Sequence, residues 1–416
     1  MAHTLYNIVI FLYGFSIRIA ALFNPKAKKF TQGRKGLFKR LHDQFRNNPQ
    51  PVVWFHCASL GEFEQGRPVI EALREYSSHY RVLLTFFSPS GYEVRKNYAG
   101  ADEVFYLPLD TPSNAKHFVE IVNPILAVFV KYEFWYNYFD ELHQRNIPLL
   151  SIAAIFRKEQ FIFSRSGRFL LQALNKTQHL FTQNDSSLLL LKQHGIDQAT
   201  VAGDTRFDRV YALKNQQIDL PVMEKFKGHE PLMVIGSSWK EDMEILLPLI
   251  NEGFGNLKYV IAPHELTAGS IRAIEEGLQQ PFIKYSETDE KDITKARVLI
   301  IDNMGLLSKL YRYGEYAYIG GAFGDGLHNT LEAATFGLPV FFGNKNYRKF
   351  NEAKELISLG GAFPIGSSDQ LRNTLQPLLN SGKRDNLGQK VADYVKQNTG
   401  ATDSIMAYIK HILPAT

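Results

Sequence analysis

Residues 52–73 read VVWFHCASLGEFEQGRPVIEAL, which combines a buried-type strand, a turn of small residues and a helix. Apolar runs of the same kind follow at 81–87, 125–130 and 147–152, and helix-like stretches lie between them. Near-continuous apolar strands that alternate with helices are typical of a parallel sheet covered on both faces. The segment and its repeats therefore predict an α/β fold.

A second series of apolar runs predicts a second parallel sheet, at 232–237, 258–263, 297–302, 316–321 and 338–343. A length of 416 residues also favours more than one domain. Two Rossmann-like halves would leave a cleft at the carboxyl ends of their strands. We therefore expect an N-terminal Rossmann-like domain at 43–210, a linker at 211–231, a C-terminal Rossmann-like domain at 232–390, and a helical segment at 391–416 that braces the two domains.

The composition excludes several classes of protein. With 45% hydrophobic and 21% charged residues, the chain is neither mainly disordered nor collagen-like. A single cysteine, Cys57, excludes a disulfide framework and any multi-cysteine metal site, and it fits a reducing compartment. The first 42 residues carry eight basic residues and no acidic one, whereas the other 374 carry 39 basic and 42 acidic residues. The body is thus near neutral, which argues against a broad nucleic-acid-binding face.

The segment 1–42 is expected to associate with a membrane. Residues 5–23 read LYNIVIFLYGFSIRIAALF, barely long enough to span a bilayer and interrupted by Arg18. Asn7, Gly14 and Arg18 fall near one helical face, which suits a helix in the membrane interface or a tilted span with Arg18 reaching for headgroups.

Seven basic residues follow between Lys26 and Arg40, and each contributes about 1 kcal/mol near an anionic leaflet. The positive-inside rule then predicts attachment at the cytoplasmic face of the inner membrane. Two alternatives stay open: a signal peptide, whose charges would precede the apolar run, and an amphipathic helix docked on its own domain.

Three turns of the first half carry candidate site residues. Ser59 and Glu62 have the spacing of a capping box, which explains both without catalysis, but Glu62 also follows a strand and could accept a proton. Ser88 in FFSPSGYE (86–93) is either a helix cap or a ligand contact. Glu133 and Trp135 in VKYEFWYN (130–137) suit sugar contacts or a packed turn equally.

The second half of the sequence contains a candidate anion-binding turn, but it lacks the common nucleotide-binding motifs. Ser237 and Ser238 in IGSSWKEDME (235–244) lie where free N–H groups gather, as in a phosphate site or a plain N-cap. No Walker lysine motif and no G-x-G-x-x-G motif follows a predicted strand. The sequence therefore disfavours a P-loop ATP-binding domain and an NAD-binding Rossmann domain.

Glycines in the run 319–343 permit close approach of backbone to ligand. There Asn329 and Glu332 again have capping-box spacing, yet a carboxylate at the start of a helix can also grip ribose hydroxyls beside a bound phosphate. His264 and His328 lack metal-site spacing, so we expect them to donate hydrogen bonds and expect no metal.

Together these motifs resemble the bacterial 3-deoxy-D-manno-octulosonic acid (Kdo) transferases of lipopolysaccharide (lipid A) biosynthesis. The resemblance spans essentially the whole chain, through HCASLGE (56–62), FSPSG (87–91), EFW (133–135), QND (183–185), GDTRFD (203–208), GSSWKED (236–242), APHE (262–265), DNMG (302–305) and GGAFGDGLHNTLEAA (320–334). It implies a GT-B glycosyltransferase whose N-terminal domain takes the acceptor and whose C-terminal domain takes the nucleotide sugar. The implied reaction moves Kdo from CMP-Kdo to a lipid A precursor of the lipid IVA type, with inversion at the anomeric carbon, release of CMP and no metal or other cofactor.

The resemblance also assigns roles to residues. It makes Glu62 the candidate general base and places Ser59, Gly61, Ser88 and Glu133 on the acceptor side. The donor-binding candidates are Gly236, Ser237, Ser238, Trp239, His264, Met304, Gly305, His328, Asn329 and Glu332.

The chain departs from the family pattern at Lys131, at Tyr136, where relatives commonly have a Pro, and at Asp325-Gly326-Leu327, where relatives tend to have a further glycine, and other functions stay open. Relatives often read Glu-x-Glu before the aromatic pair, whereas this chain has Lys131 at the first position. The alternatives are another GT-B nucleotide-sugar enzyme, such as an epimerase or a different glycosyltransferase, and a non-catalytic lipid-binding membrane scaffold. The expected partners are CMP-Kdo, the lipid A precursor and an anionic membrane surface, without nucleic acid.

Overall fold

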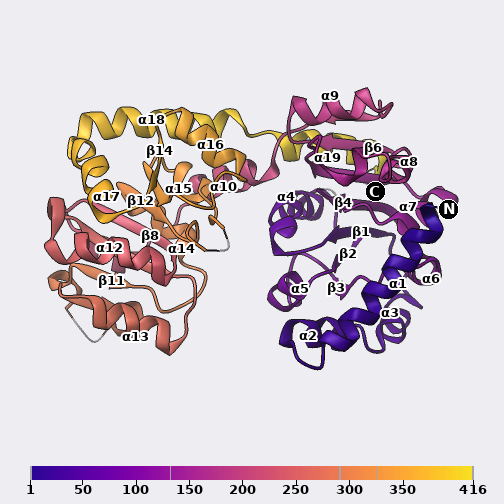
Figure 1. Cartoon of the computed structure of the whole chain (residues 1–416), viewed down its shortest axis with the longest axis horizontal. Helices are drawn as coiled ribbons and strands as arrows, with labels where there is room; N and C mark the ends of the chain where they lie inside the picture. The colour runs from indigo at the N-terminus through magenta and orange to yellow at the C-terminus, as the bar shows by residue number, and fades with distance from the viewer. Residues whose placement is uncertain (1, 132, 290–291, 325, 415–416) are drawn as a thin grey trace. The chain divides into compact units, whose positions relative to one another are not determined.

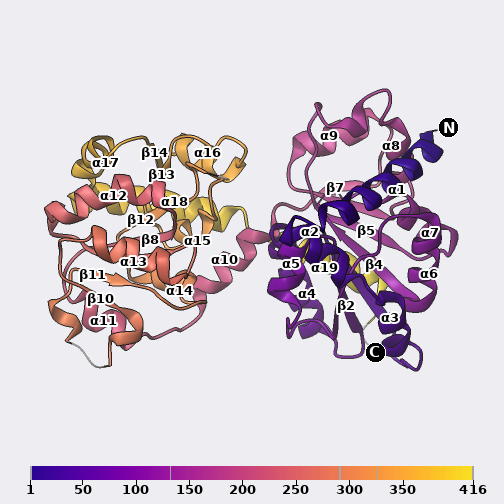
Figure 2. The same ribbon diagram turned by 60° about the horizontal axis from the view of Figure 1, so that its bottom comes forward.

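The computed structural model describes residues 2–131, 133–289, 292–324 and 326–414. The chain forms two compact units, of which unit 1 comprises Met1–Asp208 and Thr399–Thr416 and unit 2 comprises Arg209–Asn398. Each unit contains a seven-stranded sheet in which all the recorded pairs of strands are parallel, with helices on the sheet's faces (Figures 1 and 2). The predicted α/β class with two parallel sheets is therefore confirmed.

In unit 1 the strands lie in the order β3-β2-β1-β4-β5-β6-β7. Their bounds are Val52–Cys57 (β1), Arg81–Phe86 (β2), Glu103–Tyr106 (β3), Pro124–Val130 (β4), Leu149–Ala154 (β5), His179–Thr182 (β6) and Ala199–Val201 (β7). Every residue of β1 is buried, as expected for a central strand covered on both faces. The strand order reverses between β1 and β4, so the loops that follow these two strands lie side by side at the position where α/β sheets bind ligands.

The helices of unit 1 include α4, which follows β1, and α7, which follows β4. Their bounds are Leu60–Tyr76 (α4), Pro89–Arg95 (α5), Pro112–Val122 (α6), Tyr136–Gln144 (α7), Arg168–Leu174 (α8) and Asp185–Gln193 (α9). The C-terminal helix α19 (Ala401–Ile412) packs on α4, and its Ile405 and Ile409 lie in the same apolar cluster as Ile70 of α4. The helix α19 thus contributes to the hydrophobic core of unit 1.

The N-terminal helix α1 (Ala2–Ala20) is docked on unit 1 through its polar face. The Tyr6 hydroxyl donates to Asp110 over 2.5 Å, Asn7 accepts a hydrogen bond from the Asn137 amide over 2.9 Å, and Gly14 packs against Leu109. The stripe that contains Asn7 and Gly14 therefore contacts protein. Large apolar side chains face outward instead, and Phe11 is 69% exposed.

Two short helices, α2 (Pro25–Gly33) and α3 (Leu37–Phe45), follow α1. Within the part of the chain that the structure describes, no single helix is both long and apolar enough to cross a bilayer. His3–Ala20 and Pro25–Gly33 meet the length and composition criteria only together, across a bend of 120°. Membrane association of the segment 1–42 stays a prediction.

In unit 2 the order is β10-β11-β9-β8-β12-β13-β14, and it reverses between β8 and β12. The bounds are Leu232–Ser238 (β8), Lys258–Pro263 (β9), Phe282–Lys284 (β10), Val298–Ile300 (β11), Tyr316–Ile319 (β12), Val340–Gly343 (β13) and Ala362–Ile365 (β14). The main helices are Lys240–Glu252 (α12), Ala268–Gly277 (α13), Leu307–Leu310 (α14), Leu331–Ala334 (α15), Asn351–Ser358 (α16), Ser368–Leu375 (α17) and Ser381–Gln397 (α18). The loops after β8 and β12 thus meet at the reversal point of this sheet.

The stretch 211–231, interpreted from its polarity as a linker, is largely helical. It holds the end of α10 (Thr205–Asn215) and all of α11 (Pro221–Lys227), and it belongs to unit 2. Met223 and Phe226 are fully buried there, and Lys227 pairs with Glu315 over 2.6 Å. Two buried apolar side chains, the ion pair and hydrogen bonds with Tyr313 and Arg312 fix this segment on unit 2.

Asp208, in the predicted GDTRFD motif, caps the last helix of unit 1. Its carboxylate accepts hydrogen bonds from the backbone of Gly400 over 2.5 Å and from the backbone and hydroxyl of Thr402 over 2.7 Å each. We expect Asp208→Ala to lower the free energy of unfolding of unit 1 by about 1–3 kcal/mol, because these donors lose a charged acceptor.

Urea unfolding and limited proteolysis after residue 398 measure this effect. Ser404→Ala, at an exposed position of α19, is the control and should unfold like the wild type. Equal unfolding midpoints for the two variants would contradict the capping role of Asp208.

Candidate functional site

In unit 1 the loop after β1 brings Ser59 and Glu62 together without forming the capping box that their spacing predicts. Ser59 occupies the N-cap of α4, but its side chain accepts no hydrogen bond from the backbone of the helix. Its hydroxyl donates instead to the Glu62 carboxylate, which is buried. The capping interpretation of this pair is therefore wrong, because the serine hydroxyl is used to orient the carboxylate.

The loop after β4 brings a cation to the same carboxylate. Lys131 has a left-handed backbone conformation with φ of 73°, which is uncommon for a residue with a side chain, and its N–H donates to Ile152 over 2.7 Å. Its Nζ lies 3.5 Å from Oε1 of Glu62. The two loops at the strand-order reversal thus meet through an ion pair.

Glu133 adds a second carboxylate to this cluster. Burial raises the pKa of Glu133 to about 7, and the negative charge of Glu62 adds to the rise, while Lys131 and a hydrogen bond from Trp135 oppose it. Two carboxylates and one ammonium group therefore share a small, poorly solvated region. Near neutral pH, Glu133 can gain or lose a proton in response to a change in its neighbours' charge.

A buried histidine, which the sequence analysis did not single out, supports this cluster. The Trp135 indole donates to Nε2 of His56 over 3.2 Å, which places the histidine proton on Nδ1, 2.9 Å from the Thr85 hydroxyl. Burial lowers the pKa of His56 to about 3, so the ring stays neutral. His56 holds Trp135 in place; its position in a fully buried strand is the signal for such a structural role.

The other acceptor-side candidates of unit 1 show simpler geometry. Ser88 caps α5 by accepting a hydrogen bond from the backbone of Ser90 over 3.3 Å, and its own N–H donates to Ala58 in the loop after β1. At Gly61 an added Cβ atom would meet only the Ser59 hydroxyl, at 3.7 Å. The roles of Ser88 and Gly61 toward an acceptor stay predictions.

In unit 2 the end of β8 is built for close packing of backbone. A Cβ atom at Gly236 would lie 2.1 Å from the Tyr311 hydroxyl, so only glycine fits there. Ser237 has φ of 52°, and the register with β9 shifts between Gly236 and Ser238. An added Cβ atom at Gly320, after β12, would lie 2.2 Å from the carbonyl oxygen of Ser237. The loops after β8 and β12 therefore approach each other through backbone atoms, and a side chain at Gly320 would prevent this.

Three rings from three different loops form a stack beside this backbone. The Trp239 and His264 rings are 4.3 Å apart, and the His264 and His328 rings are 4.5 Å apart, both nearly parallel. The Trp239 indole donates to Nε2 of His328 over 3.1 Å. Burial lowers the pKa of both histidines, to about 4 for His328, so both rings are neutral at pH 7 and can still donate a hydrogen bond through an N–H group.

Asp242, missed as a site residue, organises the two loops. Its carboxylate accepts hydrogen bonds from the backbone of Trp239 over 2.9 Å, from the backbone of Gly321 over 3.0 Å and from the Tyr318 hydroxyl over 2.9 Å. Burial raises the pKa of Asp242. Its position three residues after Trp239 was the available signal, because a carboxylate there reaches back to the start of the helix.

Asn329 and Glu332 contact each other at the short helix α15. The Asn329 amide donates to Glu332 over 3.3 Å, and its oxygen accepts from the backbone of Leu331 over 3.1 Å. Burial raises the pKa of Glu332, and the charge of Arg209 opposes the rise. Since α15 has only four residues, the predicted phosphate-binding helix start is weaker than the sequence indicated.

Met304 and Gly305 lie in the loop between β11 and α14. The Met304 side chain is 88% exposed, and an added Cβ atom at Gly305 would meet nothing within 4 Å. Gly305 has φ of 88°, a conformation that favours glycine. The structure therefore gives these two residues an open loop rather than contacts with the ring stack.

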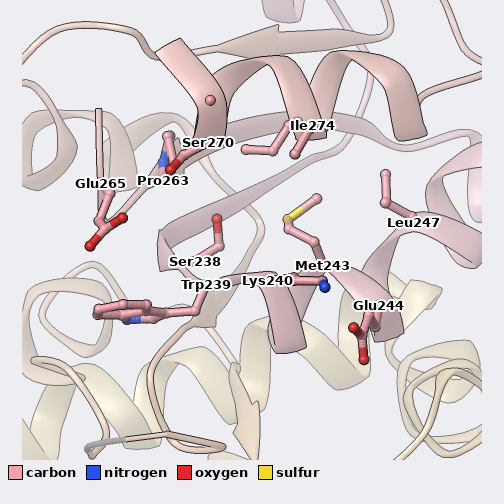
Figure 3. Close-up of a pocket in the computed structure, with 12 residues that line it drawn as sticks. Ser238, Trp239, Lys240, Met243, Glu244, Leu247, Pro263, Glu265, Ser270 and Ile274 are labelled. Atoms are coloured by element: carbon pink, nitrogen blue, oxygen red, sulfur yellow. The ribbon is translucent and has the colours of Figure 1, made fainter. Parts of the chain in front are cut away.

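A cavity of about 450 Å³ lies between α12 and α13, next to Ser238 and Trp239 (Figure 3). Met243, Leu247 and Ile274 make most of it apolar. The hydroxyl of Ser238, which is 4% exposed and has no hydrogen-bond partner among the described residues, points into it. Ser238 thus offers an unused donor and acceptor to a bound molecule.

The two units differ in the chemistry they offer. Unit 1 presents a carboxylate held by a hydroxyl and an ammonium group, which suits proton transfer. Unit 2 presents neutral hydrogen-bonding rings, close backbone approach at Gly236 and Gly320, and the carboxylate of Glu332, which suit a nucleotide sugar. Among the described residues, no group of three or more His, Cys, Asp or Glu side chains is placed to hold a metal ion.

Comparisons with known proteins agree with the motifs. Residues 32–209 match the family model of the 3-deoxy-D-manno-octulosonic-acid transferases (kdotransferases). The chain is 27% identical over 358 residues to the 3-deoxy-D-manno-octulosonic acid transferase of Aquifex aeolicus, which covers 82% of this chain and 90% of that protein. It is 25% identical over 378 residues to the enzyme of the same name from Haemophilus influenzae, with 88% of each chain covered. The resemblance to Kdo transferases is therefore confirmed.

A solved structure shares the fold across both units. The UDP-GlcNAc 2-epimerase from Neisseria meningitidis bound to UDP-GlcNAc superposes with a TM-score of 0.59 at 15% identity and covers 86% of this chain and 99% of that chain. At this identity the likeness establishes the fold alone.

The charge cluster of unit 1 makes a prediction that needs no substrate. We expect the Glu133 carboxyl carbon, followed by NMR, to titrate with a midpoint near pH 7. Glu62→Gln should lower this midpoint because it removes a neighbouring negative charge, and Lys131→Met should raise it because it removes a positive one.

Glu133→Gln identifies the resonance, and Glu75→Gln, at an exposed position of α4, is the control that should leave the midpoint unchanged. A wild-type midpoint near the ordinary glutamate value of about 4.3 would contradict the claim that burial and the charge of Glu62 raise the pKa of Glu133.

Proposed function

We propose that this chain, a relative of the Kdo transferases along most of its length, transfers Kdo from CMP-Kdo to a hydroxyl group of a lipid A precursor and releases CMP. The observation that carries the proposal is the family match of residues 32–209, because this segment contains Glu62 together with Ser59, Lys131 and Glu133 around its carboxylate. The GT-B arrangement, with the acceptor taken by unit 1 and the nucleotide sugar by unit 2, is part of the proposal.

In the proposed reaction, Glu62 is the general base. The acceptor oxygen attacks the anomeric carbon of Kdo while Glu62 takes its proton, and the bond from that carbon to the CMP phosphate oxygen breaks with its electrons going to CMP. Attack opposite to the leaving group inverts the configuration. The Ser59 hydroxyl and the Lys131 ammonium hold the two oxygens of the carboxylate, so that one orientation is maintained.

Glu133 is proposed to keep the cluster near neutral when Glu62 becomes protonated. With a pKa of about 7 that the negative charge of Glu62 helps to raise, Glu133 loses a proton more readily once Glu62 has gained one. Lys131 stands where relatives often carry a carboxylate, and it brings a positive charge to the pair. The cluster therefore works here with two carboxylates and one cation.

The donor is proposed to bind at the loops after β8, β9, β11 and β12 of unit 2. Backbone N–H groups near Ser237 would hold the phosphate, His264 and His328 would donate hydrogen bonds to the anionic groups, and Glu332 would accept from the ribose hydroxyls. Met304 and Gly305 in their exposed loop would close over the nucleotide. In this proposal the anion is held by backbone N–H groups and the two neutral histidines, and no metal ion is required.

The acceptor is a lipid, and we propose that the segment 1–42 attaches the enzyme to the cytoplasmic face of the inner membrane. The outward apolar side chains of α1, such as Phe11 at 69% exposure, and those of Leu22 and Phe23 in the turn after it, at 75% and 86%, support this, because exposed apolar residues this dense cost free energy in water. The basic residues that follow would face anionic headgroups.

The whole function is tested by one incubation. Purified full-length chain with CMP-Kdo and lipid A precursor should give a product heavier by Kdo on mass spectrometry, and NMR of the new linkage should show inversion. Transfer from a UDP-sugar instead would favour another nucleotide-sugar enzyme. Binding of CMP-Kdo without any product or hydrolysis would favour a non-catalytic scaffold.

The base assignment is tested by Glu62→Gln and Glu62→Ala. We expect kcat to fall about 10²–10⁴-fold, while the affinity for CMP-Kdo stays within about twofold, because general-base help acts on the chemical step.

Glu75→Gln on the same helix serves as the control and should keep wild-type kcat. Near-normal turnover of the Glu62 variants with unchanged unfolding curves would leave Glu62 with a structural role only.

A further inference from the structure

A second cavity, which we call the α1–α2 pocket, lies in unit 1 beneath the N-terminal helices. Its volume is about 440 Å³, and its lining includes Gly14 and Arg18 of α1, Thr31 of α2, Lys35 after α2, Leu109 and the side chain of Arg34. The close approach of Gly14 to Leu109 brings α1 onto the body of the unit. The pocket is thus formed by docking of α1 and would not exist if α1 were detached.

The pocket has an unusual charge balance. Arg18, Arg34 and Lys35 line it, and none of the described residues in its lining is acidic. Arg34 is fixed by donating to the carbonyl oxygens of Leu107 over 2.9 Å and of Phe87 over 2.7 Å, and its guanidinium lies 3.6 Å from the centre of the Phe30 ring. Three positive charges with no carboxylate in the lining favour an anion there.

The pocket also adjoins the outward apolar face of α1. Phe15 precedes Arg18 by three residues on α1, and Leu22 lies in the turn that follows the helix end at Ala20; the two side chains are 56% and 75% exposed. Figures 1 and 2 show α1 running along the outside of unit 1 to α2. A molecule that fills the pocket with an anionic group and covers these side chains with hydrocarbon would satisfy both surfaces.

We propose that the α1–α2 pocket binds the phosphate-bearing headgroup of an anionic membrane phospholipid. Arg18 and Lys35 donate to the phosphate at the mouth of the pocket, Arg34 supplies fixed positive charge at its back, and the acyl chains lie along Phe15 and Leu22. This inference rests on the membrane attachment in the proposed function and adds a discrete headgroup site to it. A soluble phosphate compound would use the cations but leave the apolar face uncovered.

The test compares two charge-matched variants of the full-length chain. Arg18→Gln/Lys35→Gln removes two charges from the pocket, and Lys28→Gln/Lys29→Gln removes two exposed charges from α2 outside the pocket lining. Affinity is measured by flotation with phosphatidylcholine vesicles and with vesicles in which part of that lipid is replaced by phosphatidylglycerol. We expect the gain in affinity from phosphatidylglycerol to fall at least tenfold more in the pocket variant than in the control variant, with unchanged thermal unfolding of both.

The other outcomes overturn the proposal in distinguishable ways. Equal losses in the two variants would mean diffuse attraction by the whole basic segment, with membrane attachment intact. Absence of wild-type binding to either vesicle would refute membrane attachment itself. Tight binding of inorganic phosphate without vesicles, lost only in the pocket variant, would assign the pocket to a soluble phosphate compound instead of a lipid.

Discussion

The whole arrangement depends on one constraint, namely that parallel strands end together at one edge of their sheet. In unit 1 the order reverses between β1 and β4, and in unit 2 it reverses between β8 and β12. At each reversal the two loops diverge to helices on opposite faces of the sheet, which leaves a crevice that side chains from both loops can line. Glu62 and Lys131 occupy this place in unit 1, and Trp239 and His328 occupy it in unit 2.

The two units offset the unfavourable free energy of burying carboxylates in different ways. In unit 1 the carboxylates of Glu62 and Glu133 are kept together by Lys131 and by the raised pKa of Glu133. In unit 2 the carboxylate of Asp242 is buried without a cation among its hydrogen-bond partners, and three donors satisfy it. The first arrangement can change its protonation near neutral pH, whereas the second fixes loop geometry.

Much of this could be predicted from sequence, and the failures have physical causes. Apolar runs such as 125–130 predicted the strands, because a strand covered on both faces is mainly apolar. Spacing could not decide the role of Ser59, because a hydroxyl can bond either to the backbone or to a nearby carboxylate. His56 and Asp242 were missed since their partners, Trp135 and Gly321, are distant in the chain. The helices within 211–231 bury two side chains, Met223 and Phe226, which the polar composition of the stretch conceals.

The N-terminal helix α1 docks on unit 1 through its polar face, and this affects how the purified protein behaves in solution. Because Tyr6 and Asn7 bond to unit 1 while most of the large apolar side chains of α1 are exposed, the surface that the helix presents is suited to hydrocarbon more than to water. In detergent-free solution such a surface favours association with other apolar surfaces, another copy of the chain included. Sedimentation or light scattering without detergent therefore measures association through α1 as well as any native assembly. Repeating the measurement at detergent concentrations below and above the critical micelle concentration separates the two.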